Sequence, residues 1–299
     1  VLMKDMLRRN VKPSSNTFAH AIKALGNLGN IEQALKLLPA MRSFNVTITP
    51  TVYHSLQQAA VNCGKSDMAV EILGEMGFNS ALPNNYNYMA ALRGCARAGM
   101  YEEAENLIEE IKTQGMKPNN SALTYTMEAY NKRGNISKSL SILTEFLGNK
   151  KELTLQMGLA GLDSCAISGN SKIASLIIDV MKSSKNGPTM LAYVLAMKAY
   201  SKANDWQSAV KLFHEIRSSD CVPSRKVYRE VISLCAKTGQ WRISAAILKD
   251  LIESVPQTSS ADFSPNYDFL WNIVAGSMAR AERWVEVIQF INEGINMKV

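Results

Sequence analysis

The sequence is poor in the residues that usually carry chemistry. Three histidines and five cysteines occur in 299 residues, and no two cysteines form a CxxC pair. An odd number of cysteines without such pairs argues against a disulfide framework or a zinc site, and it favours a reducing compartment. No GxxxxGK[ST] or GxGxxG phosphate-binding pattern occurs either. We therefore expect no catalytic centre, no metal, no cofactor and no small-molecule substrate.

Aromatic residues and long apolar runs are also scarce. Aromatic side chains make up 7% of the chain, whereas hydrophobic residues make up 46%. Because Ala, Leu, Ile and Met are plentiful, this composition favours helices over strands. No apolar run reaches the roughly 18 residues that a membrane span needs, so we expect no membrane partner. The net charge of +7 permits an anionic partner without requiring one.

The most informative feature is a glycine that returns every 35 residues. Asparagine replaces it once, and asparagine is the residue other than glycine that best tolerates a left-handed backbone. The members of this column are Gly29, Gly64, Gly99, Gly134, Gly169, Asn204 and Gly239. An internal period of this length is typical of a helical repeat array.

Other columns keep the same step. Linker prolines occur at Pro13, Pro83, Pro118, Pro188 and Pro223. Small residues follow the glycine column at Ala34, Ala69, Ala104, Ser139, Ala174, Ala209 and Ser244. We interpret each unit as two helices joined by a turn. The glycine ends the first helix with a left-handed cap, and the small residue lets the second helix approach closely.

One such hairpin cannot bury both of its faces, so neighbouring hairpins must stack. The sequence therefore predicts an all-α fold, a right-handed α-solenoid of tandem helix–turn–helix repeats. We expect residues 1–14 to end a preceding repeat, residues 15–254 to form seven repeats, residues 255–266 to form a loop insertion, and residues 267–299 to form a degenerate terminal hairpin in which Glu282 replaces the glycine. Because the chain begins at Val1 and inside a motif, we expect a processed protein or a fragment of a longer one.

Position 8, in a numbering that makes the glycine position 15, separates two families of helical repeat. The 34-residue tetratricopeptide unit needs Gly or Ala there, but this chain has bulky side chains. They are Ile22, Gln57, Leu92, Met127, Leu162, Met197 and Ile232. The 35-residue step and the segments CARAG (95–99), YEEA (101–104), MKPN (116–119) and CVPS (221–224) instead resemble the pentatricopeptide repeat (PPR) family, with P-type repeats. The resemblance covers essentially the whole chain.

The resemblance implies single-stranded RNA binding in a chloroplast or mitochondrion, with the chloroplast slightly preferred. In this family the residues at positions 5 and 35 read the edge of a base, position 2 packs against the base, and a basic residue at position 13 meets a phosphate. The base-facing residues that this implies are His54, Asn84, Asn119, Thr124, Thr154, Ser224, Arg229 and Asn272. Most other side chains at position 5, such as those of Ala19 and Met89, cannot hydrogen-bond a base. We therefore expect weak base readout.

The basic positions follow the family pattern more closely than the base-reading positions do. Position 13 holds Arg97, Lys132, Lys202 and Lys237, with Arg280 equivalent, and position 9 adds Lys23, Arg93 and Lys198. We expect these side chains to form a basic stripe on the concave face that contacts RNA phosphates. The alternative is that they are ordinary solvated helix ends.

Two functions remain open. The first is an organellar RNA-metabolism or gene-expression factor that contacts single-stranded RNA mainly through phosphates. The second is a protein–protein interaction scaffold, a subunit of an organellar transcription or translation complex. Met89, Leu159 and Val194 favour this second function, since they put apolar side chains where base readers belong, and apolar groups exposed on a concave face mark a partner site.

Overall fold

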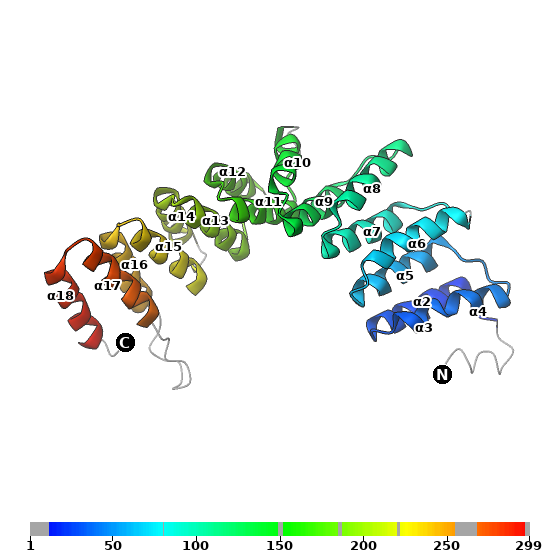
Figure 1. The fold of residues 1–299 in the computed structure, drawn as a ribbon, viewed down its shortest axis with the longest axis horizontal. Helices are drawn as coiled ribbons and strands as arrows, with labels where there is room; N and C mark the ends of the chain where they lie inside the picture. Colours follow the sequence, from blue (N-terminus) through cyan, green and yellow to red (C-terminus); the bar gives the residue numbers. More distant parts are fainter. Residues whose placement is uncertain are drawn as a thin grey trace. The chain divides into compact units, whose positions relative to one another are not determined.

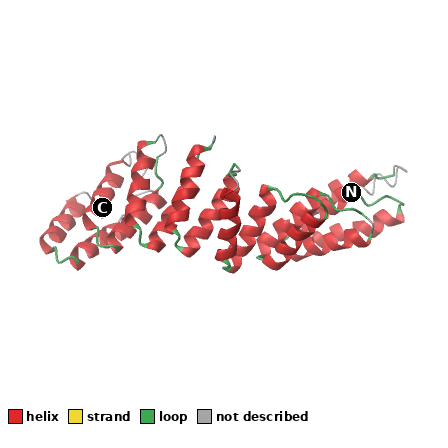
Figure 2. Ribbon diagram, turned by 90° about the horizontal axis from the view of Figure 1, so that it is seen from above, coloured by secondary structure: helices red, strands yellow, loops and turns green. Residues whose placement is uncertain are grey.

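The structure, a computed structural model, is built from paired α-helices (Figure 1). It describes residues 12–79, 81–148, 152–184, 187–219, 222–254 and 268–296, and no strand occurs in these ranges (Figure 2). The chain divides into two units, residues 1–150 and residues 151–299. Most of the predicted repeat end at 1–14, and all of the predicted insertion at 255–266, lie outside the described residues.

Each unit is a run of helical hairpins. In the first unit the pairs are α2 (Ser15–Asn27) with α3 (Ile31–Leu35) and α4 (Leu37–Ser43), α5 (Pro50–Asn62) with α6 (Asp67–Phe78), α7 (Asn85–Ala98) with α8 (Tyr101–Thr113), and α9 (Asn120–Arg133) with α10 (Ile136–Gly148). In the second unit they are α11 (Leu155–Ser168) with α12 (Ser171–Ser183), α13 (Met190–Ala203) with α14 (Trp206–Ser218), α15 (Arg225–Lys237) with α16 (Trp241–Ser254), and α17 (Asp268–Arg280) with α18 (Trp284–Asn296).

The hairpins stack through two kinds of contact. First helices pack on one another in order, α2 on α5, α5 on α7 and α7 on α9 in the first unit, and α11 on α13, α13 on α15 and α15 on α17 in the second. Second helices pack on the first helix of the next hairpin, as α6 does on α7 and α14 does on α15. We call the surface formed by successive first helices in each unit the first-helix layer. This stacking is that of an α-solenoid.

The glycine column has the predicted left-handed conformation. Its glycines have φ between 74° and 80°, and Asn204 has φ 56°. Glu282, the predicted replacement in the terminal hairpin, has φ 58°. Asn30, Asn170 and Asp205 follow directly and accept hydrogen bonds from the start of the second helix. The turn chemistry predicted from the sequence is therefore confirmed.

The columns assigned to packing are buried. All seven small residues five positions after the glycine column are fully buried, and the bulky residues at position 8 are at most 1% exposed. Cys95, Cys165 and Cys235 are also fully buried. Side chains of Leu or Met size at position 8 thus fill the space between the helices, which leaves no need for the Gly or Ala of a tetratricopeptide unit.

The second helix of the first complete repeat is interrupted. It is divided at Lys36 into α3 and α4, whereas the other repeats have one continuous second helix. Pro39 stands four residues after Leu35, the last residue of α3. Because proline has no N–H, it cannot donate to the carbonyl of Leu35, and this explains the break.

A buried polar pair joins two repeats. Gln57 on α5 and Asn87 on α7 are both fully buried. The Asn87 Nδ2 donates to Gln57 Oε1 at 3.2 Å and to the carbonyl of Pro50 at 3.1 Å. The Gln57 Nε2 donates to the carbonyl of Ala69 at 3.0 Å. These bonds satisfy the buried amides and fix how α5, α6 and α7 meet.

Candidate nucleic-acid interface

The basic residues of position 13 lie in the last turn of successive first helices. The last turn of α7 contains Arg97, that of α9 Lys132, that of α13 Lys202 and that of α15 Lys237. Arg280 has the same place in α17. All five are exposed. A cation is favourable there because the carbonyl end of a helix carries partial negative charge.

Four of these side chains reach back to the preceding first helix. Arg97 Nη1 donates to the carbonyl of Val61 at 3.1 Å, and Arg280 Nη2 donates to the carbonyl of Ala236 at 3.3 Å. The ammonium groups of Lys132 and Lys202 donate in the same way, to the carbonyls of Arg97 and Ile167. These carbonyls belong to last turns, which lack donors from within the helix. The basic column therefore also joins consecutive repeats, a role that neither sequence interpretation included.

The other basic residues of the layer differ in whether they form hydrogen bonds or ion pairs with the protein. Lys23, Lys198 and Lys237 are exposed and have no hydrogen-bond or ion-pair partner among the described residues. Arg93 is half-buried, and its Nη1 donates to Gln58 Oε1 at 3.1 Å. The three lysines are thus the position-9 and position-13 groups most open to an anion.

The predicted base-facing residues at position 5 do not form a uniform exposed row. Thr124 is 1% exposed, and its hydroxyl donates to the carbonyl of Asn120 at 2.7 Å. Its burial contradicts a base-facing role in this structure, because neighbouring helices cover it. His54 is half-buried with Nδ1 3.1 Å from the carbonyl oxygen of Tyr86. Arg229 is exposed, and its Nη2 lies 3.5 Å from Glu230 Oε1.

The apolar run predicted at position 5 is not an exposed patch. Val194 is 7% exposed, and Met89 and Leu159 are half-buried. Their packing between successive first helices accounts for their apolar character. The expectation that they form a partner surface on this layer is therefore corrected.

The residues of position 35 cap helices. Asn84 Oδ1 accepts from the backbone N–H groups of Tyr86 and Asn87 at 3.0 and 3.2 Å, Asn119 Oδ1 from Ala122 at 2.8 Å, and Thr154 Oγ1 from Met157 at 3.3 Å. Ser224 stands at the N-cap of α15 without such a bond, and Asn272 is exposed on α17. Asn and Thr before a helix are common N-caps, so the sequence contained this signal, and its capping role was missed.

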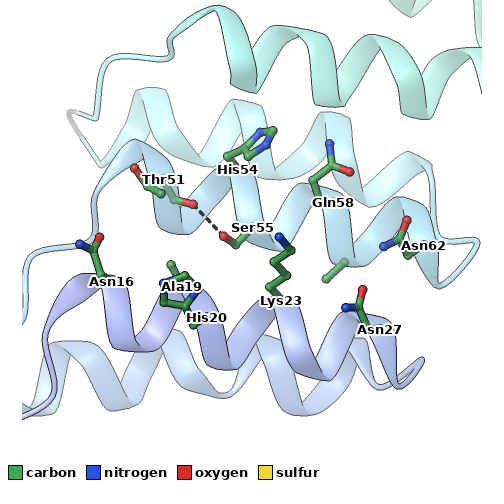
Figure 3. Close-up of a pocket in the computed structure, with 11 residues that line it drawn as sticks. Asn16, Ala19, His20, Lys23, Asn27, Thr51, His54, Ser55, Gln58 and Asn62 are labelled. Atoms are coloured by element: carbon green, nitrogen blue, oxygen red, sulfur yellow. Dashed lines mark hydrogen bonds between the residues drawn. The ribbon is translucent and has the colours of Figure 1, made fainter.

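A polar pocket of about 520 Å³ lies between α2 and α5 (Figure 3). It is lined by Asn16, Ala19, His20, Lys23, Asn27, Thr51, His54, Ser55, Gln58, Ala59 and Asn62. Asn27 and Asn62 occupy position 13, so amides replace the basic column in these two repeats. Burial, with a smaller effect of Lys23, lowers the pKa of His54, which keeps its imidazole neutral at pH 7. The pocket offers neutral donors and acceptors beside one ammonium group.

Two kinds of site do not occur in the described ranges. No three His, Cys, Asp or Glu side chains there are grouped so that they could hold a metal ion. Among the same residues, no helix has the length and apolar character that a membrane crossing requires.

Curated relatives share the repeat. A pentatricopeptide repeat-containing protein of Arabidopsis thaliana is 22% identical over 79% of this chain and 39% of the relative. The small ribosomal subunit protein mL103 (rPPR7) of Arabidopsis thaliana is 18% identical over 72% of this chain and 52% of the relative. Other Arabidopsis relatives are named chloroplastic or mitochondrial. The chain spans about half or less of the length of these relatives.

Solved structures share the fold. The pentatricopeptide repeat protein PPR10 from maize has a TM-score of 0.62 at 18% identity, over 99% of this chain and 45% of PPR10. PPR10 in complex with an 18-nt psaJ RNA element has a TM-score of 0.51 at 18% identity, over 96% of this chain and 46% of PPR10. Residues 1–54 match the pentatricopeptide repeat domain profile, and residues 86–116 and 192–221 match the PPR repeat profile. Together with the 35-residue hairpins, these matches show that the chain contains pentatricopeptide repeats.

Proposed function

We propose that this chain is an organellar RNA-metabolism or gene-expression factor whose first-helix layer contacts single-stranded RNA mainly through phosphates. The observation that carries the proposal is the row of exposed basic side chains in the last turns of successive first helices within each unit. One similar structure is that of PPR10 with a bound RNA element. Relatives named chloroplastic and mitochondrial support an organellar setting without separating the two.

The contacts between repeats leave donors for phosphate. A guanidinium has five N–H donors and an ammonium has three. A bond from Arg97 or Lys132 to a carbonyl therefore uses only part of the donor set. We expect the same side chain to join two repeats and to meet a phosphate, with Lys23, Lys198 and Lys237 adding unengaged charge.

Base readout is expected to be weak. Thr124 is buried, and the side-chain oxygens of Asn84, Asn119 and Thr154 cap helices. In DNA recognition, each good bidentate contact to a base contributes about 1–3 kcal/mol of discrimination against the wrong base. An array in which few side chains are free to hydrogen-bond a base therefore distinguishes poorly between RNA sequences. The pocket between α2 and α5 groups amide and hydroxyl side chains of this layer in one place.

A paired charge test distinguishes this layer from the rest of the surface. Lys198→Gln with Lys237→Gln removes two exposed charges from the first-helix layer, and Lys172→Gln with Lys211→Gln removes two exposed charges from second helices of the same unit. We expect the first pair to weaken binding of a random single-stranded RNA pool several-fold and the second pair to have a smaller effect. Equal effects of the two pairs would contradict a binding site on the first-helix layer.

The alternative is a scaffold subunit of an organellar transcription or translation complex. One relative, mL103, is named a small ribosomal subunit protein, and this favours the alternative. If the chain is such a scaffold, the random pool should not bind even at low salt, and neither pair of substitutions should matter.

A further inference from the structure

The polar pocket between α2 and α5 contains a histidine whose hydrogen-bonding role is fixed (Figure 3). His54 Nδ1 lies 3.1 Å from the carbonyl oxygen of Tyr86. Because a carbonyl oxygen can only accept, Nδ1 carries the proton, and Nε2 of the neutral ring is left as an acceptor. Burial lowers the pKa of His54, which keeps this neutral form at pH 7. Nε2 has no hydrogen-bond partner among the described residues and is open to a donor.

Two further lining residues have fixed roles for the same kind of reason. Gln58 Oε1 accepts from Arg93 Nη1 at 3.1 Å, so the amide NH2 of Gln58 is left as a donor. The Ser55 hydroxyl donates to the carbonyl of Thr51 at 3.0 Å, so its oxygen is left as an acceptor. The pocket therefore offers a ligand a definite pattern of donors and acceptors.

A single lysine adds charge to this pattern. Lys23 extends from α2 toward α5, and its ammonium group can only donate (Figure 3). Asn27 and Asn62 stand where other repeats have a basic residue, so the pocket contains one lysine beside neutral amides. Two donors, on Lys23 and Gln58, thus lie in one pocket with two acceptors, on His54 and Ser55.

The surroundings suit a planar polar ring. Pockets for small ligands usually measure about 300–1,000 Å³, and this one measures about 520 Å³. Tyr86 is 71% exposed, and its ring centroid lies 6.0 Å from that of His54. An exposed tyrosine ring offers a face on which a nucleobase can stack. The pocket and this ring are therefore matched to a base better than to a phosphate.

We propose that this pocket binds one unpaired guanine of a single-stranded RNA, an inference that rests on the proposed function of the first-helix layer. Guanine has two adjacent acceptors, O6 and N7, which suit the donors of Lys23 and Gln58. It also has two adjacent donor groups, N1–H and the 2-amino group, which suit the acceptors of His54 and Ser55. None of the other three RNA bases has both pairs. A lysine donating to O6 and N7 is also a common contact to guanine in DNA recognition.

A preference at one position agrees with weak base readout by the array as a whole. A single pocket gives little enrichment from a random pool, because nearly every long random sequence contains a guanine. The preference becomes visible when guanine is rare. The probes are therefore oligouridines long enough to span the array, unsubstituted or with one central guanosine, adenosine or cytidine.

Fluorescence anisotropy with these four oligomers tests the proposal. We expect the oligomer with one guanosine to bind about five-fold or more tightly than the other three, which is the lower end for one good base contact. Replacing that guanosine by 7-deazaguanosine, which lacks the N7 acceptor, or by inosine, which lacks the 2-amino group, should reduce the preference. Equal binding of all four oligomers would overturn the guanine pocket and leave the phosphate contacts intact. Failure of every oligomer to bind would overturn both proposals.

Paired variants locate the preference. Lys23→Met keeps the aliphatic stem without the donor, and His54→Phe keeps a flat ring without the Nε2 acceptor. Each should remove most of the guanosine preference while circular dichroism stays unchanged. Lys198→Met is the matched control, because Lys198 is the exposed position-9 lysine of α13. It should weaken binding of all four oligomers alike. A guanosine preference that survives both Lys23→Met and His54→Phe would contradict the assignment to this pocket.

Discussion

Arg97 on α7 hydrogen-bonds to the backbone of Val61 on α5. Its Nη1 donates to the carbonyl oxygen at 3.1 Å, and Lys132 repeats the contact one hairpin later by donating to the carbonyl of Arg97. A residue that the family resemblance assigns to phosphate thus also fastens one first helix to the next. Stability and RNA binding are expected to be linked at this column.

Replacing Arg97 should therefore lower stability in the absence of RNA. Arg97→Met keeps the aliphatic stem and removes the donors. Because a hydrogen bond from a charged group contributes about 1.5–3 kcal/mol and Arg97 is exposed, we expect a loss of about 1 kcal/mol in the free energy of unfolding. Urea denaturation measures it. Lys117→Met, at an exposed linker lysine, is the control and should change stability by less than about 0.5 kcal/mol. Equal losses would show that the contact contributes nothing.

Substitutions in the glycine column should change stability through the left-handed backbone conformation and not through the size of the new side chain. Gly134 has φ 80°, and a Cβ atom there would meet nothing within 4 Å. We expect Gly134→Ala to lower the free energy of unfolding by about 1–2 kcal/mol, which is the cost of the left-handed conformation. Gly134→Asn should have a smaller effect, because Asn204 adopts this conformation at the equivalent position. Thermal unfolding compares the two variants, and an alanine variant as stable as the unmodified chain would contradict the account.

The buried pair of Gln57 and Asn87 should be intolerant of a change that position 8 accepts elsewhere. Met127 and Met197 occupy that position without difficulty. Gln57→Met removes the acceptor of a buried Asn87 N–H, so we expect a loss of about 1–3 kcal/mol. Met197→Leu changes an apolar side chain at the same position and should cost less than about 1.5 kcal/mol. If Gln57→Met were neutral by urea denaturation, the pair would have no role in joining the repeats.

The core cysteines should resist alkylation. Burial raises the pKa of Cys95 and Cys165 to about 12 and that of Cys235 to about 11. Because the thiolate is the reactive form, a raised pKa keeps these thiols protonated at pH 8, and unfolding restores the ordinary value. Mass spectrometry after iodoacetamide treatment should find Cys63, which is half-buried, modified before Cys95, Cys165 and Cys235 in the native protein. All should react in denaturant. Rapid alkylation of Cys165 in the native protein would show that the helices around it separate, and it would contradict this prediction.

The repeat framework could be predicted from the sequence because each regular column of residues reflects a requirement of local structure. A left-handed turn restricts the residue type, as at Asn204, and a close helix contact restricts side-chain size, as at Ala104. The interface was harder to predict. Whether Thr124 reaches solvent depends on how neighbouring helices pack, and one sequence column does not contain that information. Asn84 illustrates a different failure, because its chemistry suits both a helix cap and a base contact.

The dependence of RNA affinity on salt tests the central claim most directly. If about five phosphates are contacted, the slope of log affinity against log salt should be about −3.5 for a single strand. A random single-stranded RNA pool titrated between about 50 and 200 mM salt covers the range in which such contacts are measured. A slope near −3.5 without strong sequence enrichment is the predicted result. A flat slope, or no binding at the lowest salt, would contradict a phosphate-contacting first-helix layer.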